Sequence, residues 1–289
     1  MQVSLIADCQ NLLGEGPLWD ERLGVLYWVD IRSAQLYALD FSSGRVTHRP
    51  LNAPVSAMGL TGSDLLIAAA GRQVGVLDPI AGQFAPRLEF ERDLPANRSN
   101  DGAVLSDGRF WFGTMDDGGA DQQGSLYALD CEWRLQRVLG DLSIPNGIVN
   151  TQDGCEVLVA DSSRQMIFKH RLNGVTGALG AAHLFATTLC GPSAPDGAAL
   201  DEEGCLWSAC WDGGSVVRYD PTGCVAATIT LPVSRPTSCA FAGAGLSTLF
   251  ITSAREGLSK SELAREPLAG GLFAVDVKVR GAPSARFSL

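Results

Sequence analysis

Short apolar, strand-like runs separated by turn residues fill the chain from end to end. Residues 17–19 are followed by a turn and then by an apolar run over 25–29. Gln35–Asp40 gives a third strand and 46–51 a fourth. Four short strands with turn signals between them are the pattern of one blade of a β-propeller. The only helix-permissive stretch, 259–265, lies in an insertion between strands near the C-terminal end.

One sequence motif recurs through this pattern and is called the repeated phrase below. An acidic or amide residue is followed by Gly and an apolar run, which breaks at a turn and resumes as a strand containing Trp or Phe. Successive copies start 40 to 50 residues apart, at Glu15, Val55 (degenerate), Asp101, Asn146, Asp196 and Thr237 (degenerate). A period in this range indicates a repeat architecture, and a single repeat cannot bury its own faces. The fold class that we predict is all-β, a single domain over residues 1–289 that forms a six-bladed β-propeller with four-stranded blades.

The first residues of the chain extend this prediction. Residues 2–8 look like a strand that has no partner inside its own repeat. In a closed ring the first strand often joins the last blade, and we expect that arrangement here. A closed ring leaves no edge that must pair with another chain, so no obligate protein partner is implied.

Composition narrows the range of partners. The formal net charge of −10 argues against nucleic acid and against an anionic membrane, since both attract basic patches. No apolar run approaches the length that spans a bilayer, and the N-terminal residues do not resemble a signal peptide. We therefore expect a cytoplasmic protein with reduced thiols. Its eight cysteines form no CxxC pair and are expected to serve as small core hydrophobes.

The phase of the repeat points to a site. Equivalent residues of successive blades occupy equivalent places around a ring, so the residues before the first strands should meet at one mouth of the central channel. Four of these six positions carry oxygen side chains, namely Glu15, Asp101, Asn146 and Asp196. Such groups repel one another unless protons or a cation compensate, and oxygen-only ligands suit a hard divalent ion. The alternative is that each Asp-Gly or Asn-Gly pair is only a turn.

An ordered set of motifs at these positions resembles the SMP-30/gluconolactonase/LRE family, which includes regucalcin and the bacterial sugar lactonases. The resemblance covers essentially the whole chain. Its motifs are Leu13-Gly14-Glu15-Gly16-Pro17-Leu18-Trp19, Asn97-Arg98-Ser99-Asn100-Asp101-Gly102, Trp111-Phe112-Gly113-Thr114-Met115, Gly124-Ser125-Leu126-Tyr127, Pro145-Asn146-Gly147 and Pro195-Asp196-Gly197. The stretches 252–255 and 267–271 resemble the bacterial sugar lactonase branch in particular.

The resemblance implies roles for particular residues. It implies a six-bladed propeller, in agreement with the repeat, and one divalent metal ion held by Glu15, Asn146 and Asp196. Calcium is the favoured ion, with zinc, manganese, magnesium and ferrous iron as alternatives. Asp101 is expected near the metal, acting through water.

The same resemblance implies a substrate-binding set and a base. Arg98 and Asn100 would hold the oxygens of the substrate. The family's next substrate-facing carboxylate does not align cleanly here, and Asp117 is our assignment. Asp196 is the first choice of general base, with Asp101 as the second.

The implied activity is metal-dependent hydrolysis of a sugar lactone, a pentono- or hexonolactone, to the aldonic acid. Such an enzyme is a carboxylic-ester hydrolase of the gluconolactonase, xylonolactonase or arabinolactonase type, and its partner is a small molecule. A calcium-binding regulatory protein without turnover is the first alternative, and a hydrolase of another ester, including organophosphates, is the second. No Gly-x-Ser-x-Gly elbow is present. The set of Arg98, Asn100 and Asp101 favours the enzyme, because ion binding alone does not need it.

Overall fold

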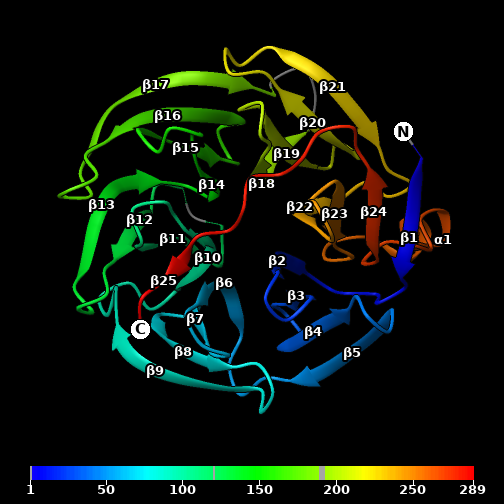
Figure 1. Ribbon diagram of the computed structural model, residues 1–289, viewed down its shortest axis with the longest axis horizontal. Helices are drawn as coiled ribbons and strands as arrows, with labels where there is room; N and C mark the ends of the chain where they lie inside the picture. The colour runs from blue at the N-terminus through cyan, green and yellow to red at the C-terminus, as the bar shows by residue number, and fades with distance from the viewer. Residues whose placement is uncertain (1, 120, 189–192) are drawn as a thin grey trace.

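Six β-sheets stand in a ring around a common axis (Figure 1). The computed structural model describes residues 2–119, 121–188 and 193–289. Each sheet is a blade whose first strand lies nearest the axis and whose later strands lie progressively farther out (Figure 1). The chain is thus a six-bladed β-propeller, as the repeat predicted. Within the described residues no helix is long and apolar enough to cross a membrane.

The first three blades follow one another along the chain, and each is an antiparallel meander. Blade 1 contains β2 (Gly14–Asp20), β3 (Val25–Asp30), β4 (Gln35–Asp40) and β5 (Arg45–Pro50). Blade 2 contains β6 (Val55–Thr61), β7 (Leu66–Ala70), β8 (Gln73–Asp78) and β9 (Gln83–Glu89). Blade 3 contains β10 (Asn97–Val104), β11 (Phe110–Asp116), β12 (Gly124–Leu129) and β13 (Leu135–Leu142).

The last three blades repeat the arrangement. Blade 4 contains β14 (Pro145–Asn150), β15 (Glu156–Asp161), β16 (Met166–Leu172) and β17 (Leu179–Thr187). Blade 5 contains β18 (Ala194–Leu200), β19 (Leu206–Trp211), β20 (Ser215–Tyr219) and β21 (Val225–Thr230). Blade 6 contains β22 (Pro236–Ala242), β23 (Thr248–Ser253), β24 (Leu272–Asp276) and β1 (Val3–Ala7).

The ring is closed by the N-terminal strand. β1 pairs antiparallel with β24, with Val3 opposite Val275, so the outermost strand of blade 6 comes from the other end of the chain (Figure 1). This confirms the expected closure. The insertion between β23 and β24 contains the short helix α1 (Lys260–Arg265), which begins at a capping box made by Ser259 and Glu262.

The C-terminal segment was not predicted and makes blade 2 five-stranded. After β24 the chain crosses the centre of the ring and ends in β25 (Arg286–Phe287), which pairs parallel with β6 (Figure 1). Along this path it hydrogen-bonds to Leu200 in blade 5 and Leu246 in blade 6. These contacts lie where first strands end and turn into second strands, on the face opposite the first residues of the first strands.

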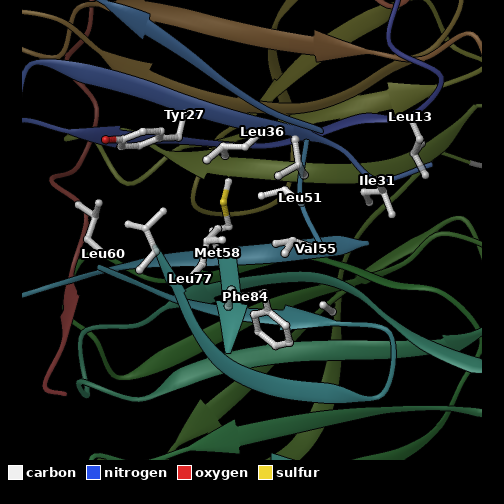
Figure 2. Packing of buried hydrophobic residues seen from close by; sticks show 14 of the residues in the cluster. Leu13, Tyr27, Ile31, Leu36, Leu51, Val55, Met58, Leu60, Leu77 and Phe84 are labelled. Atoms are coloured by element: carbon white, nitrogen blue, oxygen red, sulfur yellow. The ribbon is translucent and has the colours of Figure 1, made fainter. Parts of the chain in front are cut away.

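Apolar residues fill the spaces between neighbouring blades. Between blades 1 and 2, Tyr27 and Leu36 from one sheet face Met58 and Leu77 from the other, and all four are buried (Figure 2). Trp19, Trp28, Trp111 and Trp207 are buried as well and belong to the apolar clusters. Each blade buries its faces against its neighbours, so the ring and not the single blade is the packed unit.

The cysteines depart from expectation. Cys205, Cys210 and Cys239 are buried in the core as predicted, and Cys9 is half-buried. However, Cys131, Cys155 and Cys224 are exposed, so the assignment of all thiols to the core is wrong for these three. All three lie in turns between successive strands. The alternation of buried and exposed residues along a strand does not continue through a turn, so burial cannot be inferred there. All seven described cysteines are free thiols, and Cys190 lies outside the described residues.

Candidate functional site

A β-bulge interrupts the first strand of every blade at the same phase. The register of pairing with the second strand shifts between Glu15 and Leu18, and between Asn146 and Val149, with equivalent shifts in the other four blades. The candidate ligands therefore lie inside their strands, not before them as the repeat alone suggested. A bulge leaves a residue unpaired and re-aims its side chain, which explains how strand residues can face the channel mouth.

A cavity of about 310 Å³ opens at this mouth. It brings together five of the residues predicted from sequence or resemblance, and no histidine lines it. Its lining comprises Leu13, Glu15, Arg32, Arg98, Asn100, Met115, Ile144, Asn146, Ser162, Ser163, Ala194, Asp196, Trp211 and Glu256. These residues come from blades 1, 3, 4, 5 and 6, and none of the described residues of blade 2 contributes.

Two buried carboxylates form the most unusual feature of the cavity. Glu15 is 9% exposed and Asp196 is 6% exposed. Each accepts one hydrogen bond, from the backbone N–H of the next residue, at 3.1 Å in both cases. Among the described residues no side chain donates a hydrogen bond to either carboxylate. Burial and then the charges of Asp196 and Asp101 raise the pKa of Glu15 well above its usual value.

The pKa of Asp196 is likewise raised, by burial first and by the charge of Asp101 second, while the charge of Arg98 acts in the opposite sense. Two mutually repelling carboxylates that accept one backbone hydrogen bond each and none from a side chain are stabilised in one of two ways. They take up protons, or they share a cation that supplies the missing positive charge. The second option needs oxygen ligands that converge on one point.

Asn146 supplies the amide of the site, and its orientation is fixed from both sides. Its Nδ2 donates to the hydroxyl of Ser162 at 2.8 Å, and that hydroxyl donates to the carbonyl oxygen of Pro195 at 2.6 Å. Its Oδ1 accepts a hydrogen bond from Nδ2 of Asn100 at 2.8 Å. The Asn146 side chain of blade 4 is therefore linked by hydrogen bonds to blade 5 through Ser162 and to blade 3 through Asn100.

Two buried aspartates, one in blade 4 and one in blade 1, each bind the backbone just before a candidate ligand. The carboxylate of Asp161, which is 0% exposed, accepts hydrogen bonds from the backbone N–H groups of Ser143 and Ile144 at 3.1 and 3.2 Å. Asp30 makes the equivalent pair in blade 1 with residues 12 and 13, at 2.8 and 3.1 Å. Ile144 lies two residues before Asn146, and Leu13 lies two residues before Glu15. These aspartates therefore fix the path of the chain into the site.

Glycine is required directly after two of the candidate ligands. Gly16 and Gly147 have φ of 57° and 54°, in the left-handed region that other residues rarely adopt. A Cβ atom at Gly147 would also lie 2.9 Å from the carbonyl oxygen of Asp196. The Glu-Gly and Asn-Gly pairs of the repeated phrase thus have a structural cause, which is the bulge that turns the ligand toward the axis.

Asp101 lies behind the cavity, since it is absent from the lining although its charge acts on Glu15 and Asp196. Its Oδ2 accepts a hydrogen bond of 3.5 Å from the backbone N–H of Ile148. Burial raises its pKa, and hydrogen bonds from the backbone N–H groups of Gly102, Ile148 and Gly147 act in the opposite direction. Its carboxylate therefore acts on Glu15 and Asp196 through its charge, from outside the cavity lining.

The structure brings Arg98, Asn100 and Asp117 into contact with one another. Nη1 of Arg98 donates to the side-chain oxygen of Asn100 and to the carbonyl oxygen of Ser99, both at 2.9 Å. Nε of Arg98 donates to Oδ1 of Asp117 at 2.5 Å. Arg98 and Asn100 line the cavity, whereas Asp117 contacts it only through Arg98 and Arg32.

Among the lining residues that the sequence did not reveal, two are charged, Arg32 and Glu256. Arg32 follows β3 in a turn, and nothing in its neighbourhood distinguishes it from a solvated surface arginine. Its partner Glu256 is 224 residues away, so only the closed ring reveals the contact. Trp211 also lines the cavity, with the guanidinium of Arg235 stacked 4.9 Å from its ring centre.

The donor set can be tested against the metal that the resemblance implies. Among the residues that the structure describes, no three side chains of His, Cys, Asp and Glu are grouped so that they could hold a metal ion by themselves. A site here therefore has to include the amide oxygen of Asn146 beside the carboxylates of Glu15 and Asp196. Two buried carboxylates without side-chain donors and one oriented amide form an oxygen-only set. Such a set fits a hard divalent cation.

Known proteins resemble this chain over its full length. It is 38% identical to 6-deoxy-6-sulfogluconolactonase of Pseudomonas putida, over 96% of each chain. It is 35% identical to L-arabinolactonase of Azospirillum brasilense, over 99% of this chain and 96% of that one. Both relatives carry names that describe lactone hydrolysis, with different sugars.

The fold has an equally close counterpart among solved structures. The crystal structure of regucalcin from Agrobacterium tumefaciens, described as a calcium-binding protein, matches with a TM-score of 0.94 and 31% identity, over 99% of this chain and 97% of that one. The family model of the SMP-30/gluconolactonase/LRE-like region matches residues 13–255, which include every candidate ligand. The chain belongs to the SMP-30/gluconolactonase/LRE-like family.

Proposed function

We propose that the protein is a metal-dependent lactonase that hydrolyses a sugar lactone, a pentono- or hexonolactone, to the aldonic acid. The observation that carries the proposal is the pair of buried carboxylates, Glu15 and Asp196, which share one cavity with the oriented amide of Asn146. The names of two full-length relatives, a 6-deoxy-6-sulfogluconolactonase and an L-arabinolactonase, support the reaction class.

A lactone is a cyclic ester, so its hydrolysis needs a polarised carbonyl and an activated water. A bound divalent ion, calcium in first place, would act as a Lewis acid that polarises the carbonyl, and manganese, magnesium, zinc and ferrous iron are the alternatives. Glu15, Asn146 and Asp196 would hold this ion. A carboxylate must then take the proton of the attacking water. Asp196 lines the cavity and is our general base, while Asp101 remains the second candidate.

The rest of the substrate would be bound by the polar lining. Nη2 of Arg98 makes no hydrogen bond to the described residues, so its two N–H groups are available to hydroxyl or ring oxygens. Arginine suits this role because its donors form a rigid fork. Asn100 is oriented by Arg98 and Asn146 and would add a further polar contact. A cavity of about 310 Å³ lies at the lower end of the range for small-molecule sites, as suits a single sugar unit.

Two alternatives predict different behaviour. A calcium-binding regulatory protein would hold the ion without turning over a lactone, and the regucalcin structure is described only as calcium-binding. A hydrolase of another ester, including organophosphates, would have an apolar mouth. Leu13, Met115, Ile144, Ala194 and Trp211 are apolar lining residues, but nine of the fourteen are polar or charged. Apolar atoms make up most of the exposed lining, so it is these particular polar groups, and not the surface as a whole, that favour a hydroxylated substrate.

The test is proton release from a panel of aldonolactones, with protein stripped of metal and then resupplied with single divalent ions. We expect turnover well above spontaneous hydrolysis that depends on the ion. Arg98→Ala should lower kcat/KM by at least tenfold and leave calcium affinity nearly unchanged. Calcium binding without acceleration of any lactone would favour the regulatory alternative. Equal losses of turnover and calcium affinity in Arg98→Ala would contradict the role assigned to that residue.

A further inference from the structure

A chain of ion pairs crosses the rim of the cavity. Nε of Arg32, in the turn after β3, donates to Oε1 of Glu256 at 2.7 Å, and its Nη1 donates to Oδ2 of Asp117 at 2.9 Å. The other oxygen of Asp117 accepts the hydrogen bond from Arg98. The chain Glu256–Arg32–Asp117–Arg98 therefore connects blade 6, blade 1 and blade 3 at the mouth.

Blade 2 contributes little to the mouth of the cavity, and the chain of ion pairs lies on that side. β7 and β8 are joined by only Gly71 and Arg72, and none of the described residues of blade 2 lines the cavity. The contact between Arg32 and Asp117 joins the two blades that flank blade 2. It forms the side of the mouth that blade 2 does not supply.

The charges of the four residues in the chain of ion pairs sum to zero. Arg32 and Arg98 contribute two positive charges, and Asp117 and Glu256 contribute two negative charges. Burial acts to raise the pKa of Asp117, but hydrogen bonds from Arg32 and Arg98 lower it below its ordinary value, so this carboxylate is ionised. Among the described lining residues Arg32 and Arg98 are the cations, and both are paired. No cation is left over for an acidic substituent on the substrate.

Donors for uncharged groups remain in place. A guanidinium has five N–H groups, and Arg32 uses one of them for Glu256 and one for Asp117. With the two N–H groups on Nη2 of Arg98, the rim has several donors that can bind hydroxyl oxygens. Side chains of paired arginines are also held in place by their partners, so they lose less conformational freedom when a ligand binds.

We propose that Arg32 is a specificity-determining residue of this site, and that the ion-pair chain selects neutral polyhydroxy lactones over lactones that bear an acidic group. The proposal rests on the lactonase activity proposed above. Arg32 contacts the part of the substrate away from the reacting carbonyl, and it also keeps Asp117 paired. Glu256 holds Arg32 and cancels its charge, so an acidic substituent meets a rim without net positive charge.

A matched pair of substrates tests the selection. Gluconolactone and 6-deoxy-6-sulfogluconolactone differ only in the group on the sixth carbon, a hydroxyl in one and a sulfonate in the other. We expect kcat/KM of the wild-type protein, loaded with its most effective divalent ion, to be at least tenfold higher for the neutral lactone. Equal or higher kcat/KM for the sulfonated lactone would overturn the proposal.

Three variants assign the effect to the ion-pair chain. Arg32→Gln should raise KM for gluconolactone about fivefold or more with little change in kcat, because the lost contact is remote from the reacting carbonyl. Glu256→Gln frees the charge of Arg32 and should shift the preference toward the sulfonated lactone by about fivefold. Arg22→Gln is the control. Arg22 also joins two blades through two carboxylates, Asp20 and Asp64, but on the opposite face.

The outcomes separate this proposal from the one on which it rests. A wild-type protein that turns over no lactone with any ion would overturn both. An active wild-type protein whose Arg32→Gln variant has the KM of Arg22→Gln would overturn only the role of Arg32. An unchanged preference in Glu256→Gln would overturn the charge balance as its cause. Melting temperatures of the variants within a few degrees of one another would exclude general unfolding as the explanation.

Discussion

At the scale of single residues, the position of a ligand depends on groups that never touch it. Asp161 binds two backbone N–H groups just ahead of Asn146. Asp161→Asn keeps the shape of the side chain but turns one acceptor into a donor that faces an N–H group. We expect a loss of about 1–3 kcal/mol in the free energy of unfolding and a calcium affinity about tenfold weaker. Chemical denaturation and calorimetric titration measure the two quantities.

Asp201→Asn is the matched control for this change. Asp201 is also fully buried, binds the backbone N–H groups of Glu203 and Cys205 and pairs with an arginine, but it lies on the opposite face. This variant should lose comparable stability and keep its calcium affinity. If both variants weaken calcium binding equally, the loss comes from general destabilisation and Asp161 has no particular role in the site.

The same scale shows what the sequence could and could not reveal. Glu15, Asp101, Asn146 and Asp196 could be singled out because they recur at one phase of a repeat, and the family resemblance then proposed three of them as ligands. The glycines after Glu15 and Asn146 have a backbone conformation that requires glycine. Arg32 and Glu256 could not be found in this way. Their function lies in contacts between blades 1, 3 and 6, and such contacts leave no local pattern.

At the scale of elements, the C-terminal segment is the piece that the strand pattern did not predict. β25 has only two residues and pairs parallel with β6, so it carries neither the length nor the turn signals of a blade strand. Its stability comes from Phe287, which is 0% exposed and packs in the cluster with Phe110 and Ile67, and from the ion pair of Arg286 with Asp20. These contacts were not predictable because they depend on the path that the segment after β24 takes across the closed ring.

Phe287→Ala tests whether this segment stabilises the ring. Removing a fully buried phenylalanine side chain typically costs about 3–5 kcal/mol, and we expect a loss of that size in the free energy of unfolding by denaturant. Lactone turnover well below the melting temperature should be unchanged, because the cavity is on the other face. Leu289→Ala, which truncates an exposed side chain two residues later, is the control and should change little. A stability loss below about 1 kcal/mol in Phe287→Ala would show that the segment is dispensable.

At the scale of the whole molecule, the site exists only in the closed ring. Glu15 comes from blade 1, Asn146 from blade 4 and Asp196 from blade 5, so no single blade holds all three candidate ligands. The β1–β24 pairing that closes the ring therefore also determines the distance between the ligands. A cation bound by three blades would stabilise the fold as a unit, because unfolding separates all of its ligands.

This coupling predicts a pH dependence. The pKa values of Glu15 and Asp196 are raised in the folded, metal-free protein, mainly by burial. Groups of this kind favour the fold while they are protonated, that is below their unfolded pKa values of about 4. Their contribution is lost as the pH rises through the higher folded values. The metal-free protein thus loses stability from this pair on going from acid toward neutral pH, and a cation that replaces the protons restores it.

The increase in melting temperature on addition of calcium should therefore be larger at pH 8 than at pH 5. Taking the difference between calcium-loaded and metal-free protein at each pH removes the titration of other groups that calcium does not contact. The double variant Glu15→Gln, Asp196→Asn keeps the size of both side chains and removes both charges, and its calcium-induced increase should vanish at either pH. An increase of the same size at pH 5 and pH 8 in the wild-type protein would contradict the coupling. It would mean that calcium binds where these carboxylates do not, and the assignment of the metal ligands would fail with it.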